Sequence, residues 1–201
     1  MTDEAPDELD HGRRRFLTGA ATVVGGAGVV FAAIPFLGFL RPSAEAESRG
    51  APIEVDIGKM EPGQRLEFKW KGSPIWVINR TEEHLEALDK DVGRLRDPDS
   101  EVDQQPSYCD NMYRSVDPNV FVVIPICTHL GCIPTYYPEI GPMDFDQNWL
   151  GGFFCPCHGA RYDIAGRVYK GQPAPRNLEV PPHHSDGDTL IVGEHPDDYQ
   201  A

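Results

Sequence analysis

The chain has 201 residues, and its 32 acidic residues outnumber its 18 lysines and arginines, giving a formal net charge of −14. This charge argues against a nucleic-acid-binding protein, because phosphate contacts require clustered cations. A hydrophobic fraction of 40% and a charged fraction of 25% are typical of a globular domain and exclude disorder of the whole chain. The 20 glycines and 19 prolines favour short strands joined by turns over a helix bundle.

An uncharged segment near the N-terminus predicts a transmembrane helix. Residues 16–40 carry no charge and, at about 1.5 Å per residue, reach roughly 37 Å, enough to cross a hydrocarbon core of about 30 Å. Arg13, Arg14 and Arg15 precede this segment, whereas only Arg41 follows it closely. By the positive-inside rule, the N-terminal residues 1–15 are expected in the cytoplasm and residues 42–201 on the far side of the membrane.

The run Arg13-Arg14-Arg15-Phe16-Leu17 resembles a twin-arginine export signal, which serves proteins that fold and load a cofactor before export. One alternative is a plain signal anchor, whose arginines provide only the positive-inside bias. Another is a secretory peptide cleaved near Ser43–Ala46, but the apolar segment is long for that purpose. We therefore expect a single-pass anchor that is retained.

The rest of the chain predicts a tether followed by a mainly β domain. Residues 41–52 are small and polar, with prolines near both ends, and they predict a flexible tether. Thr81 as an N-cap, followed by acidic residues, predicts one helix that ends at Gly93. Apolar alternation and β-branched composition predict antiparallel strands at residues 53–57, 66–70, 75–78 and 120–124.

Two short loops concentrate the cysteines. They read Cys127-Thr128-His129-Leu130-Gly131-Cys132 and Cys155-Pro156-Cys157-His158-Gly159. The loops contain six potential ligands, four cysteines and two histidines, whereas one zinc ion binds four. A zinc site that used both histidines would therefore leave two thiols without a metal. In an oxidising location two surplus thiols would form a disulfide. Two cysteines and two histidines suit a [2Fe–2S] cluster of the Rieske type.

Both motifs closely resemble the Rieske iron–sulfur protein of quinol:cytochrome c oxidoreductase, the cytochrome bc1 complex. The resemblance extends to Ser73–Val77, Leu95–Pro98 and Gly171–Leu178, and so covers nearly the whole chain. It implies an all-β fold: a Rieske-type antiparallel domain over residues 53–201 with a small cluster-binding subdomain at about 125–178, plus the N-terminal transmembrane α-helix.

The resemblance also implies roles for individual residues. One [2Fe–2S] cluster would be bound by Cys127, His129, Cys155 and His158, and Cys132 would pair with Cys157. His158, and secondarily His129, would hydrogen-bond quinol and take part in the coupled proton transfer. The residues implied around the cluster are Leu130, Gly131, Ala160, Tyr162 and Pro173.

Two features depart from the family pattern. A serine commonly follows the His-Gly pair and donates a hydrogen bond to a bridging sulfide, which Ala160 cannot do, whereas Tyr162 retains the position whose hydroxyl bonds the Cys127 sulfur. We therefore expect a lower reduction potential than in serine-bearing relatives. The 22-residue stretch Ile133–Phe154 is also longer than in many relatives, and its Gly-Pro content predicts a packed loop.

The implied function is transfer of one electron, with coupled proton release, from quinol at the outer membrane face to a c-type cytochrome. The implied partners are cytochrome b and cytochrome c1 subunits in a dimeric complex of the bacterial inner membrane, with the Rieske domain in the periplasm. The alternatives are the small subunit of an arsenite-oxidase-like periplasmic enzyme, a ring-hydroxylating oxygenase component, and a zinc-stabilised binding module. Cys132 and Cys157 argue against the oxygenases, and the tether and the proline-containing loop argue against the arsenite-oxidase-like enzyme.

Two features remain outside these motifs. Cys109 has no partner in the cysteine count and is expected to be a buried or partly buried free thiol. His183 and His184 precede a polar turn and are expected to form a solvated surface pair.

Overall fold

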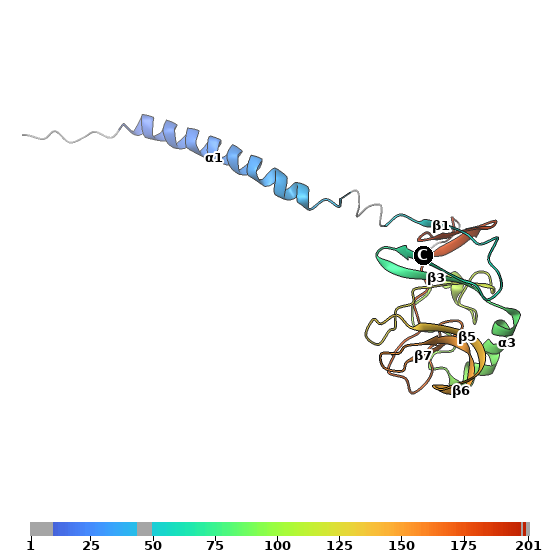
Figure 1. The fold of residues 1–201 in the computed structure, drawn as a ribbon. Coiled ribbons are helices and arrows are strands. Elements are labelled where there is room, and N and C mark those ends of the chain that lie inside the picture. The colour runs from blue at the N-terminus through green and yellow to red at the C-terminus, as the bar shows by residue number, and fades with distance from the viewer. Residues whose placement is uncertain (1–9, 44–49, 198, 200–201) are drawn as a thin grey trace, which may run out of the picture. The chain divides into compact units, whose positions relative to one another are not determined.

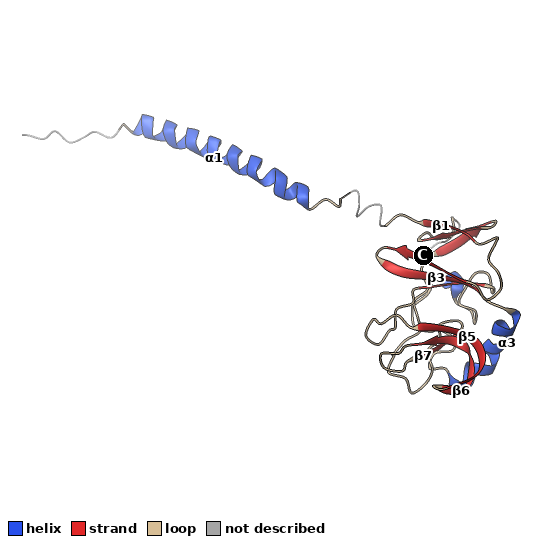
Figure 2. Ribbon diagram, in the orientation of Figure 1, coloured by secondary structure: helices blue, strands red, loops and turns tan. Residues whose placement is uncertain are grey.

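The computed structural model describes residues 10–43, 50–197 and 199 (Figure 1). The chain divides into two compact units, Met1–Ser48 and Arg49–Ala201. Helix α1 lies in the first unit, and the second consists mainly of short strands and loops (Figure 2). The mainly β fold with one N-terminal apolar helix agrees with the fold class predicted from the sequence.

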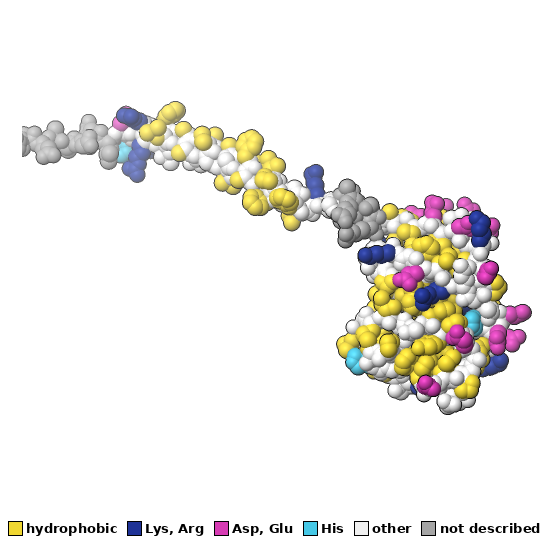
Figure 3. Space-filling model, viewed as in Figure 1, with side chains coloured by type: hydrophobic (Ala, Val, Ile, Leu, Met, Phe, Trp, Pro, Cys, Tyr) yellow, Lys and Arg dark blue, Asp and Glu magenta, His cyan; other side chains and the backbone are white. Residues whose placement is uncertain are grey.

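Helix α1 (His11–Phe39) begins five residues before the predicted span, because Asp10 caps it. The Asp10 carboxylate accepts hydrogen bonds from the backbone N–H groups of Gly12 and Arg13 at 2.9 and 3.0 Å. The arginines of the export motif are therefore helical, and hydrophobic side chains follow them along the helix (Figure 3). The helix is long and apolar enough to cross a membrane. Much of the predicted tether, at 44–49, lies outside the described residues.

Three antiparallel sheets of three strands each form the second unit. The first sheet has the order β1-β9-β8, the second β2-β3-β4 and the third β5-β6-β7. The bounds of the strands are β1 Ile53–Asp56, β2 Arg65–Trp70, β3 Ser73–Asn79, β4 Val120–Val123, β5 Thr135–Met143, β6 Asp146–Phe154, β7 Arg161–Asp163, β8 His183–Asp186 and β9 Thr189–Val192.

Strands β3 and β4 of the middle sheet are buried on both faces and separate two hydrophobic cores. Along β3, Ile75 and Val77 pack into the core shared with the first sheet, whereas Trp76 and Ile78 pack into the core that contains Cys127 and Cys155. This alternation follows from the two-residue period of a strand. The Trp76 ring stacks on Phe153 of β6 with centroids 6.0 Å apart, so the middle sheet supports the third sheet directly.

Helix α3 (Glu82–Asp91) is the helix predicted after Thr81, and it continues into a short 3-10 helix, η1 (Val92–Arg94). Thr81 and His84 form a reciprocal capping box: the Thr81 hydroxyl accepts from the His84 N–H, and His84 Nδ1 accepts from the Thr81 N–H, both at 3.2 Å. His84 Nε2 donates to the carbonyl of Pro138 on β5 at 2.8 Å. One imidazole therefore caps the helix and ties it to the third sheet.

The packed loop predicted at Ile133–Phe154 is instead a β-hairpin, formed by β5 and β6. Register shifts after Tyr137 and after Gly141 interrupt the pairing, so the alternation expected of strands is broken in the sequence. Gly152 must lack a side chain, because a Cβ there would lie 2.1 Å from the Tyr162 carbonyl oxygen of β7. Glycine and proline, which usually mark loops, here permit bulges and close strand approach.

The expectation of a solvated His183–His184 pair is wrong for His183. Its side chain is only 2% exposed, because residue 183 begins β8 and faces the interior opposite Val192. His183 Nδ1 donates to the Pro181 carbonyl at 2.9 Å, and Nε2 lies 4.0 Å from the Cys109 sulfur. Cys109 is buried and free, as predicted, and burial raises the pKa of its thiol to about 12.

Burial of His183 makes the stability of the domain dependent on pH. Burial lowers the pKa of the folded imidazole, so below about pH 6.5 the unfolded chain takes up a proton that the folded chain rejects. Unfolding free energy should therefore decrease as the pH falls from 7.5 to 5.5. We expect His183→Asn to lose part of this decrease in thermal or denaturant unfolding. The exposed His195→Asn is the control, and equal pH dependence in wild type and His183→Asn would contradict the assignment.

Candidate metal centre

The two cysteine-rich loops have the same backbone closure. In the first loop, which follows β4, Cys127 N–H donates to the Cys132 carbonyl at 2.8 Å, and Gly131 N–H donates to the Cys127 carbonyl at 2.9 Å. In the second loop, between β6 and β7, Cys155 N–H donates to the Ala160 carbonyl at 2.7 Å, and Gly159 N–H donates to the Cys155 carbonyl at 2.9 Å.

Each loop requires a glycine four residues after its first cysteine. Gly131 and Gly159 have φ values of 83° and 77°, which is a left-handed backbone conformation that residues other than glycine rarely adopt. The glycine of each motif therefore has a conformational reason to be there. As a result, each loop places a cysteine at its base and a histidine near its tip.

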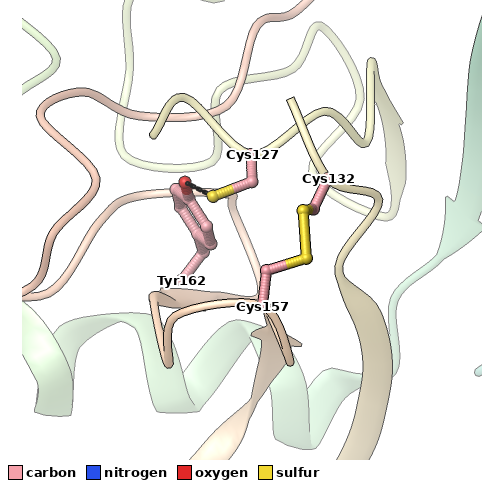
Figure 4. Close-up of a disulfide and its surroundings, with 4 residues drawn as sticks. All are labelled: Cys127, Cys132, Cys157 and Tyr162. Atoms are coloured by element: carbon pink, nitrogen blue, oxygen red, sulfur yellow. Dashed lines mark hydrogen bonds between the residues drawn. A yellow bond between two sulfur atoms is a disulfide. The ribbon is translucent and has the colours of Figure 1, made fainter. Parts of the chain in front are cut away.

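A disulfide joins the two loops (Figure 4). It links Cys132 to Cys157, which is the pairing that the resemblance implied. The sulfur of Cys155 lies within 4.8 Å of these two sulfurs. Because the disulfide uses two of the three, this group is not a site by itself, and Cys155 remains the available thiol.

Four of the six candidate ligand residues remain after the disulfide is formed, and the loops bring them together in two pairs. Cys127 and Cys155 are buried and carry free thiols. The His129 and His158 rings meet edge to face, with centroids 4.6 Å apart. His129 is half-buried, and its Nδ1 is enclosed without a hydrogen-bond partner, whereas the His158 side chain is exposed.

These residues fit a [2Fe–2S] cluster bound by two sulfurs and two nitrogens. A buried nitrogen without a partner costs free energy unless something binds it, and a metal ion at His129 Nδ1 would do so. Burial, reinforced by the neighbouring Cys127 thiol, raises the pKa of Cys155 in the metal-free chain. A bound metal ion would stabilise the thiolate form and reverse this preference.

Comparison with known proteins agrees with this geometry. Residues 101–182 match the family described as "Rieske [2Fe-2S] domain", and residues 4–43 match "Ubiquitinol-cytochrome C reductase Fe-S subunit TAT signal". The ubiquinol-cytochrome c reductase iron-sulfur subunit of Allochromatium vinosum is 52% identical over 183 residues, which cover 90% of this chain and 88% of that protein. The chain belongs to the Rieske iron–sulfur subunits of ubiquinol–cytochrome c reductase.

Two further matches are more distant. The mitochondrial cytochrome b-c1 complex subunit Rieske of Saccharomyces cerevisiae is 37% identical over 190 residues, covering 93% of this chain and 79% of that protein. A solved structure described as "Hyperthermophilic respiratory Complex III" matches 88% of this chain and 98% of its own, with 29% identity and a TM-score of 0.49. Through its family, this Rieske subunit has a [2Fe–2S] cluster as cofactor and an export signal of the twin-arginine type.

The residues implied around the cluster fall into a buried group and an exposed group. Tyr162 is buried on β7, and its hydroxyl donates to the Cys127 sulfur at 3.2 Å (Figure 4). The same hydroxyl accepts from the Thr128 N–H at 3.1 Å, and burial raises its pKa above the usual range. Ala160 is fully buried. The exposed residues are Leu130, which is 71% exposed, Gly131 and Pro173.

Sequence reasoning missed two polar residues of this region. Thr128 Oγ1 donates to the Arg176 carbonyl at 2.7 Å and thereby joins the first loop to the proline-containing loop. Gln172 reaches Gly159 of the second loop. Thr128 lies within the first motif, but no sequence signal marks the partners that either side chain contacts.

Because the disulfide is the covalent link between the loops, its loss should loosen the ligand set. A bridge across 25 residues typically contributes about 2–4 kcal/mol. We expect the double substitution Cys132→Ser and Cys157→Ser to lower the unfolding temperature and to accelerate loss of iron and acid-labile sulfide on warming. Cys109→Ala is the control for loss of a thiol elsewhere. Retention of iron at the wild-type rate in the double variant would contradict this role.

Proposed function

We propose that the second unit of the chain takes one electron from quinol at the outer membrane face and passes it to a c-type cytochrome. The main observation that supports this proposal is that His158 is exposed beside His129, whereas the free thiols of Cys127 and Cys155 are buried. The subunit thus presents its imidazoles to other molecules and shields its sulfurs from them. Quinol as the substrate is supported by the relatives that are described as ubiquinol-cytochrome c reductase iron-sulfur subunits.

In this proposal, Cys127 and Cys155 bind one iron as thiolates, and His129 and His158 bind the other through Nδ1. When bound, the [2Fe–2S] cluster supplies a site that accepts and returns one electron. Neutral imidazoles make this site less negative than four thiolates would, which favours electron uptake. Leu130 and Gly131 follow His129 in the first loop, and Pro173 follows Gln172, whose amide reaches the Gly159 carbonyl of the second loop.

The imidazoles are also proposed to accept the proton that quinol releases. A neutral ring bound through Nδ1 carries its proton on Nε2; once Nε2 has lost that proton, it can accept a hydrogen bond and then the proton of the quinol hydroxyl. His158 is the better candidate for this contact because its side chain is exposed, whereas His129 is half-buried. Exposed Leu130, adjacent to His129, offers an apolar surface for a quinone-binding partner.

The apolar helix α1 and the family support a proposal for the partners and the orientation. Cytochrome b and cytochrome c1 are the proposed partner subunits, in a dimeric complex of the bacterial inner membrane. Three arginines at the start of α1, against Arg41 beyond its end, support a cytoplasmic N-terminus and a periplasmic Rieske domain. The segment 41–52 is proposed as the tether that allows this domain to move between partners.

The relatives do not favour the alternative of an arsenite-oxidase-like small subunit, since the matches named above are reductase subunits. The test is the low-temperature electron paramagnetic resonance spectrum of ascorbate-reduced membranes, with and without an inhibitor of the outer quinol site. We expect a Rieske-type signal whose shape changes with the inhibitor. A signal that ignores the inhibitor would overturn the quinol role, and absence of a signal after full chemical reduction would overturn the cluster assignment.

Ala160 should limit the reduction potential. A hydroxyl at this buried position would donate to a bridging sulfide and stabilise the more negative, reduced cluster, so Ala160→Ser should raise the potential. A hydrogen bond to a charged group contributes about 1.5–3 kcal/mol, and about 1.4 kcal/mol corresponds to 59 mV for one electron, so we expect a change on the order of 50 mV or more.

The opposite change is expected for Tyr162→Phe, which removes the hydroxyl that donates to Cys127. Ala87→Ser, at a buried position of helix α3, is the matched control and should leave the potential unchanged. Redox titrations monitored by electron paramagnetic resonance measure all three variants. No rise in Ala160→Ser would show that the missing hydroxyl does not set the potential.

A further inference from the structure

A network of charged side chains runs from the end of α3 to the second loop. The Asp146 carboxylate, which is 6% exposed, accepts from Arg94 and, at 2.9 Å, from Arg161. Arg94 also pairs with Asp91 at 3.0 Å, and Tyr169 donates to Asp91. Arg161 lies immediately before Tyr162 on β7, so the network is connected to the strand that leaves the second loop.

Gln172 extends this network to the backbone beside His158. In the amide orientation that satisfies both neighbours, Gln172 Nε2 donates to the Gly159 carbonyl at 2.8 Å, and Oε1 accepts from Arg161 Nη2 at 2.8 Å. The backbone of Gln172 is held as well, because its own carbonyl accepts from Arg96 at 3.0 Å. The amide thus bridges the second loop and an arginine that Asp146 already fixes.

The position of His158 depends mainly on the backbone that carries it. The side chain is exposed, and its described contact is with the ring of His129. Within the second loop, Gly159 N–H and Cys155 N–H close the turn inward, whereas the Gly159 carbonyl is held only from outside the loop, by Gln172. Without that bond, the peptide between Gly159 and Ala160 has more freedom to rotate.

We propose that Gln172 is a positioning residue for quinol oxidation: held by Arg161, it donates to the Gly159 carbonyl and so fixes the orientation in which His158 meets the quinol. This inference rests on the proposed function. The residue acts through the loop and does not touch the substrate. Displacement of a group that must meet a substrate is costly, and loss of a partner that orients a metal ligand typically costs about 10–100-fold in metal affinity or activity.

The test uses the intact complex with Gln172→Ala and Gln172→Glu. The glutamate keeps an acceptor for Arg161, with added charge, but has no N–H to donate to Gly159. Gln147→Ala is the matched control, because Gln147 lies near the start of β6 and its side chain donates to the nearby Met143 carbonyl, at 3.0 Å. All variants are compared for iron content, unfolding temperature, quinol oxidation kinetics and the Rieske spectrum.

We expect Gln172→Ala and Gln172→Glu to retain iron and to lower kcat/KM for quinol about tenfold. Their spectral lines should broaden, because the His158 ring would occupy a wider range of orientations, and the inhibitor-induced change of shape should weaken. Amide hydrogen exchange at residues 159–161 should accelerate. Gln147→Ala should match the wild type in each measurement.

Other outcomes would overturn the proposal. Wild-type kinetics in Gln172→Glu would show that the bond to Gly159 is dispensable. A lower unfolding temperature in Gln172→Ala with unchanged spectrum, exchange and kcat/KM would show a purely structural role. A wild-type complex without a Rieske signal, or without quinol oxidation, would instead overturn the proposed function itself, and this result does not depend on any Gln172 variant.

Discussion

The disulfide between Cys132 and Cys157 is the constraint on which the site depends, because it joins two loops that carry all four proposed ligands. The loops leave different strands and bury little apolar surface at their tips, where His158, Gly131 and Leu130 are exposed. Hydrophobic packing therefore cannot hold the tips in register. A covalent link and a small set of hydrogen bonds do so, and packing contributes only at the base, around Cys127 and Cys155.

Beneath this site, buried charge supports the strand that carries Tyr162. Asp163 pairs with Arg167 at 2.7 Å, with both side chains almost fully buried, and Arg114 donates to the Ala165 carbonyl at 3.0 Å. Burial lowers the pKa of Arg114 to about 10, which leaves it charged at neutral pH. Removal of one partner from such a buried pair typically costs about 3–5 kcal/mol. Buried charged side chains that have no access to water therefore fix the turn after β7. This turn supports Tyr162, whose hydroxyl donates to the Cys127 sulfur.

Local sequence signals specified the parts of the structure that local physics determines. The alternation along β1 and β2 and the Thr81 cap depend on neighbours within a few residues, and each is found where it was predicted. The β5–β6 hairpin was missed because its glycines and prolines serve bulges and close strand approach, which only the partner strands reveal. His183 and Gln172 were missed for a related reason, since their roles come from contacts with Cys109 and Gly159, which are distant in sequence.

The same reasoning explains why the site combines a rigid base with exposed ligands. An imidazole that exchanges an electron and a proton with another molecule must be reachable, so it cannot gain its position from burial. Its position must come from the backbone that carries it, and every polar group of that backbone left without a partner adds freedom at the ring. The inward hydrogen bonds of each loop fix one side of the turn. A bond from outside, such as that of Gln172 to the Gly159 carbonyl, fixes the other side without covering the ring.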